Sequence, residues 1–146
     1  MQAMHSNNLL TFEEIIEDDN LLIDHYLRIK NFDSKTSFLL TLYYISSKPL
    51  QKRIIEIIPN FLNPFACVIG MWQDFYKPSE IEFANNWSTD EITLIKSFES
   101  DFRKMYKNHS KHYPKSVDDL FSKSDFNRLA ENAGILVLKL TKAASI

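Results

Sequence analysis

The chain has 146 residues, of which 45% are apolar, and its formal net charge is −2. That length suits one domain, the supply of large apolar side chains excludes an intrinsically disordered chain, and the balanced charge gives no general attraction to nucleic acid or to anionic membranes. Because only two glycines are present, phosphate loops, dinucleotide fingerprints and nucleophile elbows are excluded as well, since each needs closely spaced glycines.

The first helix signals stand near the N-terminus. Thr11 and Glu14 form a capping-box pattern, in which the hydroxyl and the carboxylate each bind a free backbone amide. Apolar residues follow at helical spacing, and the polar run 18–20 marks a point where this segment can divide into two shorter helices.

Proline and small polar residues mark the starts of the next helices. Asp33 or Ser34 can cap one of them, and Pro49 and Pro64 suit a first helical turn, where a missing amide hydrogen costs nothing. We expect helices over residues 38–45, from Pro49 to a stop at Pro59, over residues 65–76 and, as one short turn, over residues 79–84.

The clearest predicted helix begins at a second capping box, formed by Ser88 and Glu91, and runs to about Asn108. At 100° per residue, its apolar and basic side chains separate onto opposite sides. The side predicted to face the core carries Leu94, Ile95, Phe98, Phe102, Met105 and Tyr106.

The last part of the chain allows two interpretations. Ser116 and Asp119 can cap a short helix, and another helix should begin near Asp125. Gly134 then resembles a helix stop, after which residues 135–138 fit a short buried strand. We favour a helix here, because a lone strand has no evident partner.

These signals predict a mainly all-α fold, a compact single-domain bundle of about six helices over residues 1–146, with residues 1–10 as a flexible N-terminal segment. The single cysteine, Cys67, cannot form an internal disulfide, and residues 1–10 lack the features of a secretory signal. The longest uncharged run, residues 57–73, contains prolines and polar residues and indicates buried core rather than a membrane span. We therefore expect a soluble, cytoplasmic protein.

Neither the cysteine nor the histidines have the neighbouring residues that a catalytic site or a metal site requires. Cys67 lies near the first turn of a predicted helix, which can lower a thiol pKa, but its neighbours are apolar, so we interpret it as buried and inert. His109 and His112 share one helix face, yet no Cys, Asp or Glu lies between Phe102 and Val117 to complete a metal site. We expect these histidines to meet free carbonyls at a helix end, and we expect no metal, cofactor or catalytic residue.

Charge is distributed unevenly. Six carboxylates and no cation lie between Glu13 and Asp24, which is typical of a solvated helix face. The reverse pattern is a run of five cations without an acidic residue: Arg103, Lys104, Lys107, Lys111 and Lys115. We interpret this run as a solvated basic edge facing the acidic N-terminal helix. The alternative is an anion-binding or nucleic-acid-binding site, because the interleaved Tyr106 and Tyr113 are suited to stacking on bases.

A loop in the middle of the chain is bracketed by four aromatic residues: Trp72, Phe75, Tyr76 and Trp87. Such residues are favoured anchors of protein-binding surfaces, although we expect most of these four to be core. With glycine-dependent and metal sites eliminated, the sequence predicts a non-enzymatic protein-binding module, such as a small inhibitor, immunity-type protein or adaptor, whose partner is another protein. The alternative is nucleic-acid or polyanion binding through residues 103–115, and no membrane partner is expected.

Overall fold

The computed structural model describes residues 10–30, 32–57 and 63–145, with side chains to residue 141. These residues form nine helices and no strand, which confirms the all-α class. The helices are α2 (Phe12–Ile16), α3 (Asp19–Tyr26), α4 (Ser34–Ser46), α5 (Lys48–Ile57), α6 (Pro64–Phe75), α7 (Ile81–Ala84), α8 (Thr89–His109), α9 (Val117–Ser122) and α10 (Ser124–Ser145). They exceed the expected six because α2, α7 and α9 are one-turn or two-turn helices. Of the expected flexible segment 1–10, only Leu10 lies among the described residues, and the expected stop at Pro59 lies outside them.

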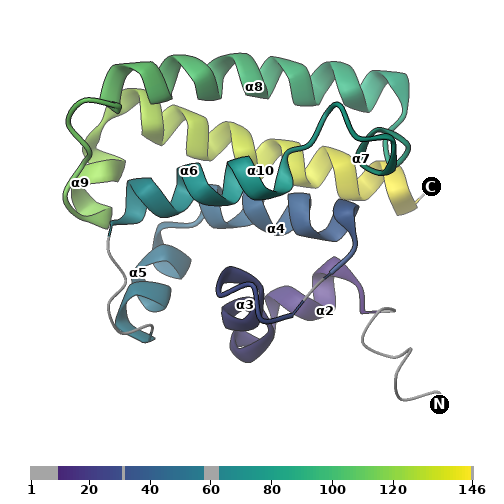
Figure 1. Cartoon of the computed structure of the whole chain (residues 1–146), viewed down its shortest axis with the longest axis horizontal. Coiled ribbons are helices and arrows are strands. Elements are labelled where there is room, and N and C mark those ends of the chain that lie inside the picture. The colour runs from purple at the N-terminus through teal and green to yellow at the C-terminus, as the bar shows by residue number, and fades with distance from the viewer. Residues whose placement is uncertain (1–9, 31, 58–62, 146) are drawn as a thin grey trace.

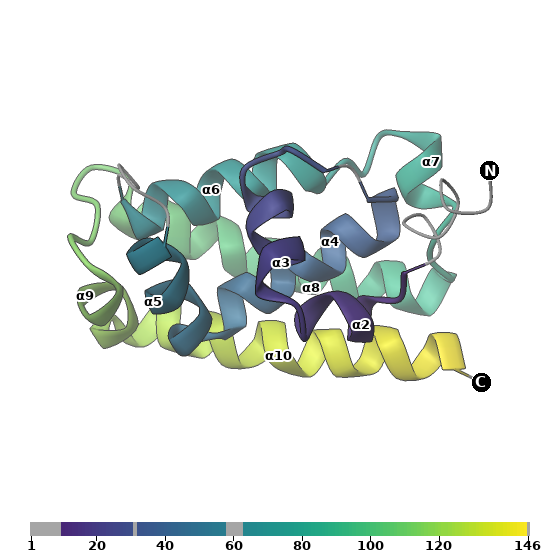
Figure 2. The same ribbon diagram turned by 90° about the horizontal axis from the view of Figure 1, so that it is seen from below.

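The four longest helices, α4, α6, α8 and α10, pack together and enclose most of the core (Figure 1). Helix α8 runs along one side of the molecule, whereas the shorter α2, α3 and α5 cover α4 from the opposite side (Figure 1 and Figure 2). Helix α4 contacts α2, α5, α6, α7 and α10. Seven consecutive residues from Thr36 to Leu42 are buried, as expected of a helix that is surrounded by others.

Local hydrogen bonds explain where the helices begin. Both capping boxes are formed. The Thr11 and Ser88 hydroxyls accept hydrogen bonds from the backbone amides of Glu14 and Glu91, and the carboxylates of these glutamates accept hydrogen bonds from the backbone amides of Thr11 and Ser88. Asp33 and Ser116 are the other side-chain caps that the sequence predicted, and Asn63, directly before Pro64, caps α6 in the same way. Each satisfies an amide that the first helical turn would otherwise leave unpaired.

Helix α10 continues through Gly134, which confirms the favoured helical interpretation; the alternative, with this glycine as a helix stop and residues 135–138 as a strand, is wrong. A side chain at Gly134 would lie 3.7 Å from Ser46 Cβ, because α10 packs closely on α4 at this point. Leu136 and Val137 are buried whereas Ile135 and Leu138 are exposed. This burial pattern follows the helical period.

The predicted phase of α8 is correct at its centre. Ile95, Phe98, Phe102 and Met105 are buried, but Tyr106, expected on the core side, is 38% exposed. Its ring lies at the edge of the apolar face, parallel to Phe65 at a centroid distance of 6.3 Å. None of the described helices combines the length and the apolar character needed to cross a bilayer.

Candidate functional site

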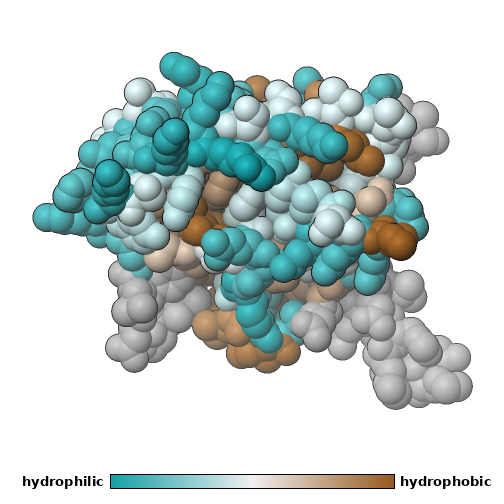
Figure 3. Space-filling view, turned by 45° about the horizontal axis from the view of Figure 1, so that its top comes forward, coloured by the Kyte–Doolittle hydropathy of each residue, from teal (hydrophilic) through white to brown (hydrophobic). Residues whose placement is uncertain are grey.

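The four aromatic residues that the sequence singled out do not form one exposed patch. Trp72, Tyr76 and Trp87 are buried, and Phe75 is half-buried and stacks on His25 at 4.6 Å, away from Trp87. Phe38 of α4 contacts Trp72, Tyr76 and Trp87. The face carrying α8 is mostly hydrophilic, with small separate hydrophobic spots (Figure 3). The aromatic set is therefore mainly core, and only parts of it reach hollows in the surface.

One of these hollows lies between the loop after α6, the short helix α7 and the start of α8. Tyr76 and Trp87 both line it, and its volume is about 140 Å³. We call it the α7–α8 pocket. The rest of its lining is mostly apolar and includes Pro78, Phe83, Ala84, Ile92, Ile95 and Lys96. The structure thus brings together two of the four predicted aromatic residues, at a concave rather than a protruding surface.

Two features of the elements that form the α7–α8 pocket were not predicted from the sequence. Ile81 is 77% exposed, and it lies three residues before Ala84 on α7, hence on the same side of that helix. Lys35 of α4 places its ammonium group 5.4 Å from the centre of the Trp87 ring. The Trp87 indole N–H is buried and has no hydrogen-bond partner among the described residues. No local pattern connects residue 35 with residue 87, so the sequence offered no signal for this contact.

Tyr76 is held in place by a polar chain that ends on α8. Its hydroxyl donates a hydrogen bond of 2.7 Å to Glu99, and the other carboxylate oxygen of Glu99 accepts two bonds from Arg103, at 2.7 and 3.0 Å. Burial opposes ionisation of Glu99, but Tyr76 and Arg103 together hold the pKa of that carboxyl below its usual value. Burial and the Glu99 contact raise the pKa of Tyr76. The network links a predicted protein-binding residue to the first residue of the predicted basic segment.

A second hollow lies between α6 and α8, where Trp72 reaches the surface. It has a volume of about 210 Å³ and is lined by Ile69, Trp72, Gln73, Phe102, Arg103 and Tyr106. The Trp72 ring stacks on Phe102 with a centroid distance of 4.4 Å. This groove places an apolar surface directly beside the basic segment.

All five cations of the basic segment are exposed. Arg103 is paired with Glu99, whereas the side chains of Lys104, Lys107, Lys111 and Lys115 form no ion pair within the described part of the chain. Tyr113 and Tyr106 are 40% and 38% exposed, and both contact Phe65 of α6. The two tyrosines of this segment are therefore neighbours on one surface.

The prediction that the basic segment faces the acidic N-terminal helix is wrong. Helix α8 lies on the opposite side of the bundle from α2 and α3, with α4 between them (Figure 1). The acidic segment instead contacts α5, where Arg53 lies 3.3 Å from Asp19. Helix packing decides this arrangement, because exposed ion pairs are too weak to choose it.

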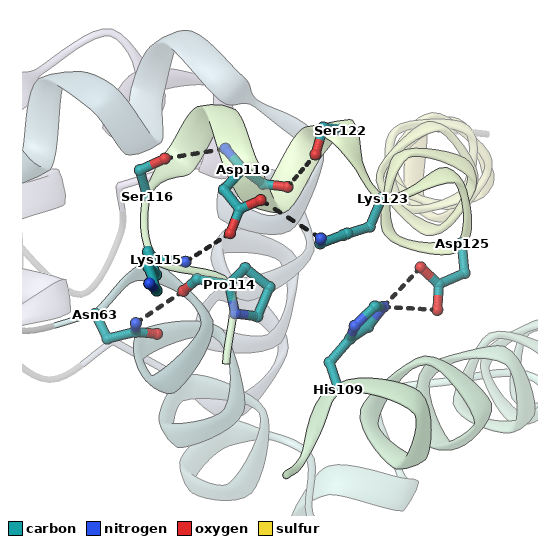
Figure 4. Close-up of polar contacts among 9 residues, drawn as sticks. All are labelled: Asn63, His109, Pro114, Lys115, Ser116, Asp119, Ser122, Lys123 and Asp125. Carbon is teal, nitrogen blue, oxygen red and sulfur yellow. Dashed lines mark hydrogen bonds and ion pairs between the residues drawn. The ribbon is translucent and has the colours of Figure 1, made fainter. Parts of the chain in front are cut away.

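The end of the basic segment is fixed by carboxylates at the corner between α8, α9 and α10 (Figure 4). His109 Nε2 lies 2.8 Å from Asp125 Oδ1, and the Asp119 carboxylate accepts the Lys115 amide hydrogen bond. His109 was expected to meet free carbonyls and instead meets a carboxylate. Burial opposes ionisation of Asp125, but Asn108 and His109 hold its pKa below the usual value.

The described residues contain neither a complete metal site nor an activated cysteine. Among the described residues, no group of three or more Cys, His, Asp or Glu side chains is placed to hold a metal ion. Cys67 is half-buried rather than buried as predicted, and burial raises the pKa of its thiol. This direction is opposite to the lowering that activates a cysteine nucleophile.

No known protein family, curated protein or solved structure matches this chain.

Proposed function

We propose that this chain is a non-enzymatic protein-binding module of the inhibitor or adaptor kind, and that the α7–α8 pocket receives an apolar side chain of its partner. The observation that carries this proposal is an apolar pocket walled by Tyr76 and Trp87, together with Ile81, which is 77% exposed on the same short helix that contributes Phe83 and Ala84 to the pocket lining. Apolar pockets walled by Trp and Tyr are typical energetic centres of protein interfaces. The single free cysteine suits the reducing cytoplasm as the place of action.

The pocket is suited to binding because its walls are already fixed. The Tyr76 hydroxyl is held by Glu99, and the Trp87 ring packs on Phe38 and Phe83. Side chains that are ordered before binding lose less conformational entropy when the partner arrives. An incoming aliphatic side chain would cover Ile81 and the apolar pocket wall together.

We propose binding without catalysis because the ionisable groups with the most strongly shifted pKa values lie outside the α7–α8 pocket. Burial lowers the pKa of His25 and raises those of Tyr26 and Tyr44, and these three side chains belong to the core between α3, α4 and α6 rather than to the pocket lining. The ionisable groups at the pocket are Tyr76 and Lys96. Neither provides a nucleophile paired with a base.

The test is a comparison of partners captured by three proteins: the wild type, Ile81→Glu and Ile29→Glu. Ile29 is 69% exposed in the connection between α3 and α4, so its substitution adds the same charge at a site distant in the fold. We expect a partner that is captured by the wild type and by Ile29→Glu but lost with Ile81→Glu. Amine cross-links to that partner should start from Lys35 and Lys96. Equal capture by all three proteins would rule out the pocket.

A second candidate function, polyanion binding, is favoured by one observation. Lys104, Lys107 and the exposed Tyr106 lie on α8, and Lys111 follows the end of that helix; none of these lysines forms an ion pair among the described residues. Tyr106 and Tyr113 both contact Phe65. Cations that neutralise phosphates and rings that stack on bases are the two elements of single-strand binding. The measurement that separates this candidate from protein binding is described in the Discussion.

A further inference from the structure

The outer face of α10 carries apolar side chains that nothing in the described structure covers. Ile135 and Leu138 are 51% and 58% exposed, three residues apart on one side of the helix. Helix α10 forms one long edge of the molecule (Figure 2). Next to this face, a groove of about 240 Å³ separates α10 from α8, and its lining includes Leu94, Phe98, Asp101, Asn132, Ile135 and Lys139.

Two opposite charges flank Ile135 symmetrically. Glu131 precedes it by four residues and Lys139 follows it by four, which places each about 6 Å away along the helix axis. Both are exposed, and neither forms an ion pair with any residue that the structure places. Within α10, Ile135 lies four residues from each of the two charges. Arg128, three residues before Glu131, forms no ion pair with it in the described part of the chain, and Glu131 accepts a hydrogen bond of 3.4 Å from Asn127.

We propose that this face binds a second copy of the same chain, with the two α10 helices antiparallel across a twofold axis at Ile135. In that arrangement Ile135 meets its own counterpart, and Glu131 of each copy meets Lys139 of the other. Leu138 of one copy then faces Asn132 of the other, a residue that lines the α8–α10 groove. The Glu131–Lys139 ion pair is thus formed twice, as a twofold interface requires, and the contact between the two Ile135 side chains lies on the axis.

A second copy is favoured over another partner because the charge pattern is complementary to its own reverse. The order Glu131, Ile135, Lys139 becomes Lys, Ile, Glu when the helix is turned end to end, so every charge meets its opposite. A parallel pairing would place like charges together, which is unfavourable. Closed twofold dimers are also the commonest assembly of soluble chains.

The test is charge reversal followed by analytical ultracentrifugation over a range of protein concentrations. The wild type should dimerise, and Glu131→Lys or Lys139→Glu alone should weaken the dimer about tenfold or more, because each change turns two attractive pairs into repulsive ones. The double variant should dimerise again. An equimolar mixture of the two single variants should form a heterodimer tighter than either homodimer, since all four interfacial charges then pair.

Two exposed apolar positions give the matched controls. Ile135→Glu should abolish the dimer, and Ile29→Glu should leave it unchanged, because Ile29 lies between α3 and α4 rather than on α10. Circular dichroism melts should show every variant folded, since all the changed side chains are exposed. A wild type that stays monomeric at high micromolar concentration would overturn the proposal. So would a mixture of single variants that associates no better than its components.

Discussion

The guanidinium group of Arg28 binds the carboxylate of Asp74, 46 residues later, with Nη2 at 2.6 Å and Nε at 2.9 Å. Arg28 follows the end of α3 with a φ of 61°, the backbone conformation that usually selects glycine. The Arg28 amide binds the His25 carbonyl and the Ile29 amide binds the Asp24 carbonyl, which is the Schellman pattern of a helix end. An arginine occupies a glycine position here because its side chain joins the end of α3 to the end of α6.

The effect of the unfavourable φ of Arg28 on stability can be measured separately from the effect of its ion pair with Asp74. Arg28→Ala and Arg28→Gly both remove the contact with Asp74, but only glycine relieves the unfavourable φ. We expect Arg28→Gly to be more stable than Arg28→Ala by about 1 kcal/mol in urea denaturation. Asp74→Asn, which removes the charge alone, should cost at most about 1 kcal/mol because the pair is partly exposed. An alanine variant at least as stable as the glycine variant would refute this account.

His25 should make the fold sensitive to mild acid. Burial, and secondarily the charge of Arg28, lower the pKa of His25 from 6.5 to about 3. Below pH 6.5 the unfolded chain therefore binds a proton that the folded protein does not. The free energy of unfolding should decrease as the pH falls towards the folded pKa, by at most about 1.4 kcal/mol per pH unit. Above pH 6.5 this contribution is absent.

The measurement compares urea denaturation of the wild type and His25→Phe between pH 6.5 and about 5, above the range where most carboxyl groups titrate. Phenylalanine keeps a ring against Phe75 and has no proton to bind. We expect a smaller loss of stability on acidification in this variant. The exposed His112, changed to Gln, is the control and should retain the wild-type slope. Parallel pH dependences in all three proteins would contradict the assignment to His25.

The core face of α8 provides a test of packing. Phe98 and Phe102 are each 4% exposed, and both contact Trp72. Truncating either to Ala should reduce the free energy of unfolding by about 3–5 kcal/mol. Ser100→Ala, on the exposed side of the same helix, should change it by no more than about 0.5 kcal/mol. Comparable losses in the three variants would show that the helix is rotated from the described position.

The basic segment separates the two candidate functions. The test variant replaces Lys104, Lys107 and Lys111 with Gln and keeps Arg103, because Arg103 holds Glu99 and, through it, Tyr76. The fold should persist, since these lysines are exposed. We expect capture of a protein partner at the α7–α8 pocket to be unchanged, apart from slower association at low salt. Sedimentation checks that the variant keeps its fold, and partner capture measures its binding.

A different outcome would promote polyanion binding. The wild type would then bind single-stranded RNA or DNA with an affinity that falls steeply with salt, and the triple variant would bind weakly and with a flatter salt dependence. Fluorescence anisotropy of a labelled oligonucleotide at several salt concentrations measures both effects. Ile81→Glu serves as the control, because it lies on α7, outside the basic segment.

Helix starts could be read from the sequence because their determinants are local. Thr11 with Glu14, and Ser88 with Glu91, satisfy amides within three residues of each other, so no distant part of the chain is needed to form them. The alternation of apolar and polar residues along α8 likewise identified Phe98 and Phe102 as core, since the helical period determines which side chains share a face.

Contacts between distant segments decided the rest. Gly134 has the local character of a helix stop, yet α10 continues through it because the residues on both sides pack on α4 and α8. Trp72, Tyr76 and Trp87 are residue types typical of binding surfaces, but all three are buried in the core, where Phe38 contacts each of them. The α7–α8 pocket and the Arg28–Asp74 pair join residues from separate helices. Burial and pocket shape depend on how helices pack, and a helical period specifies which face turns inward but not which helix it meets.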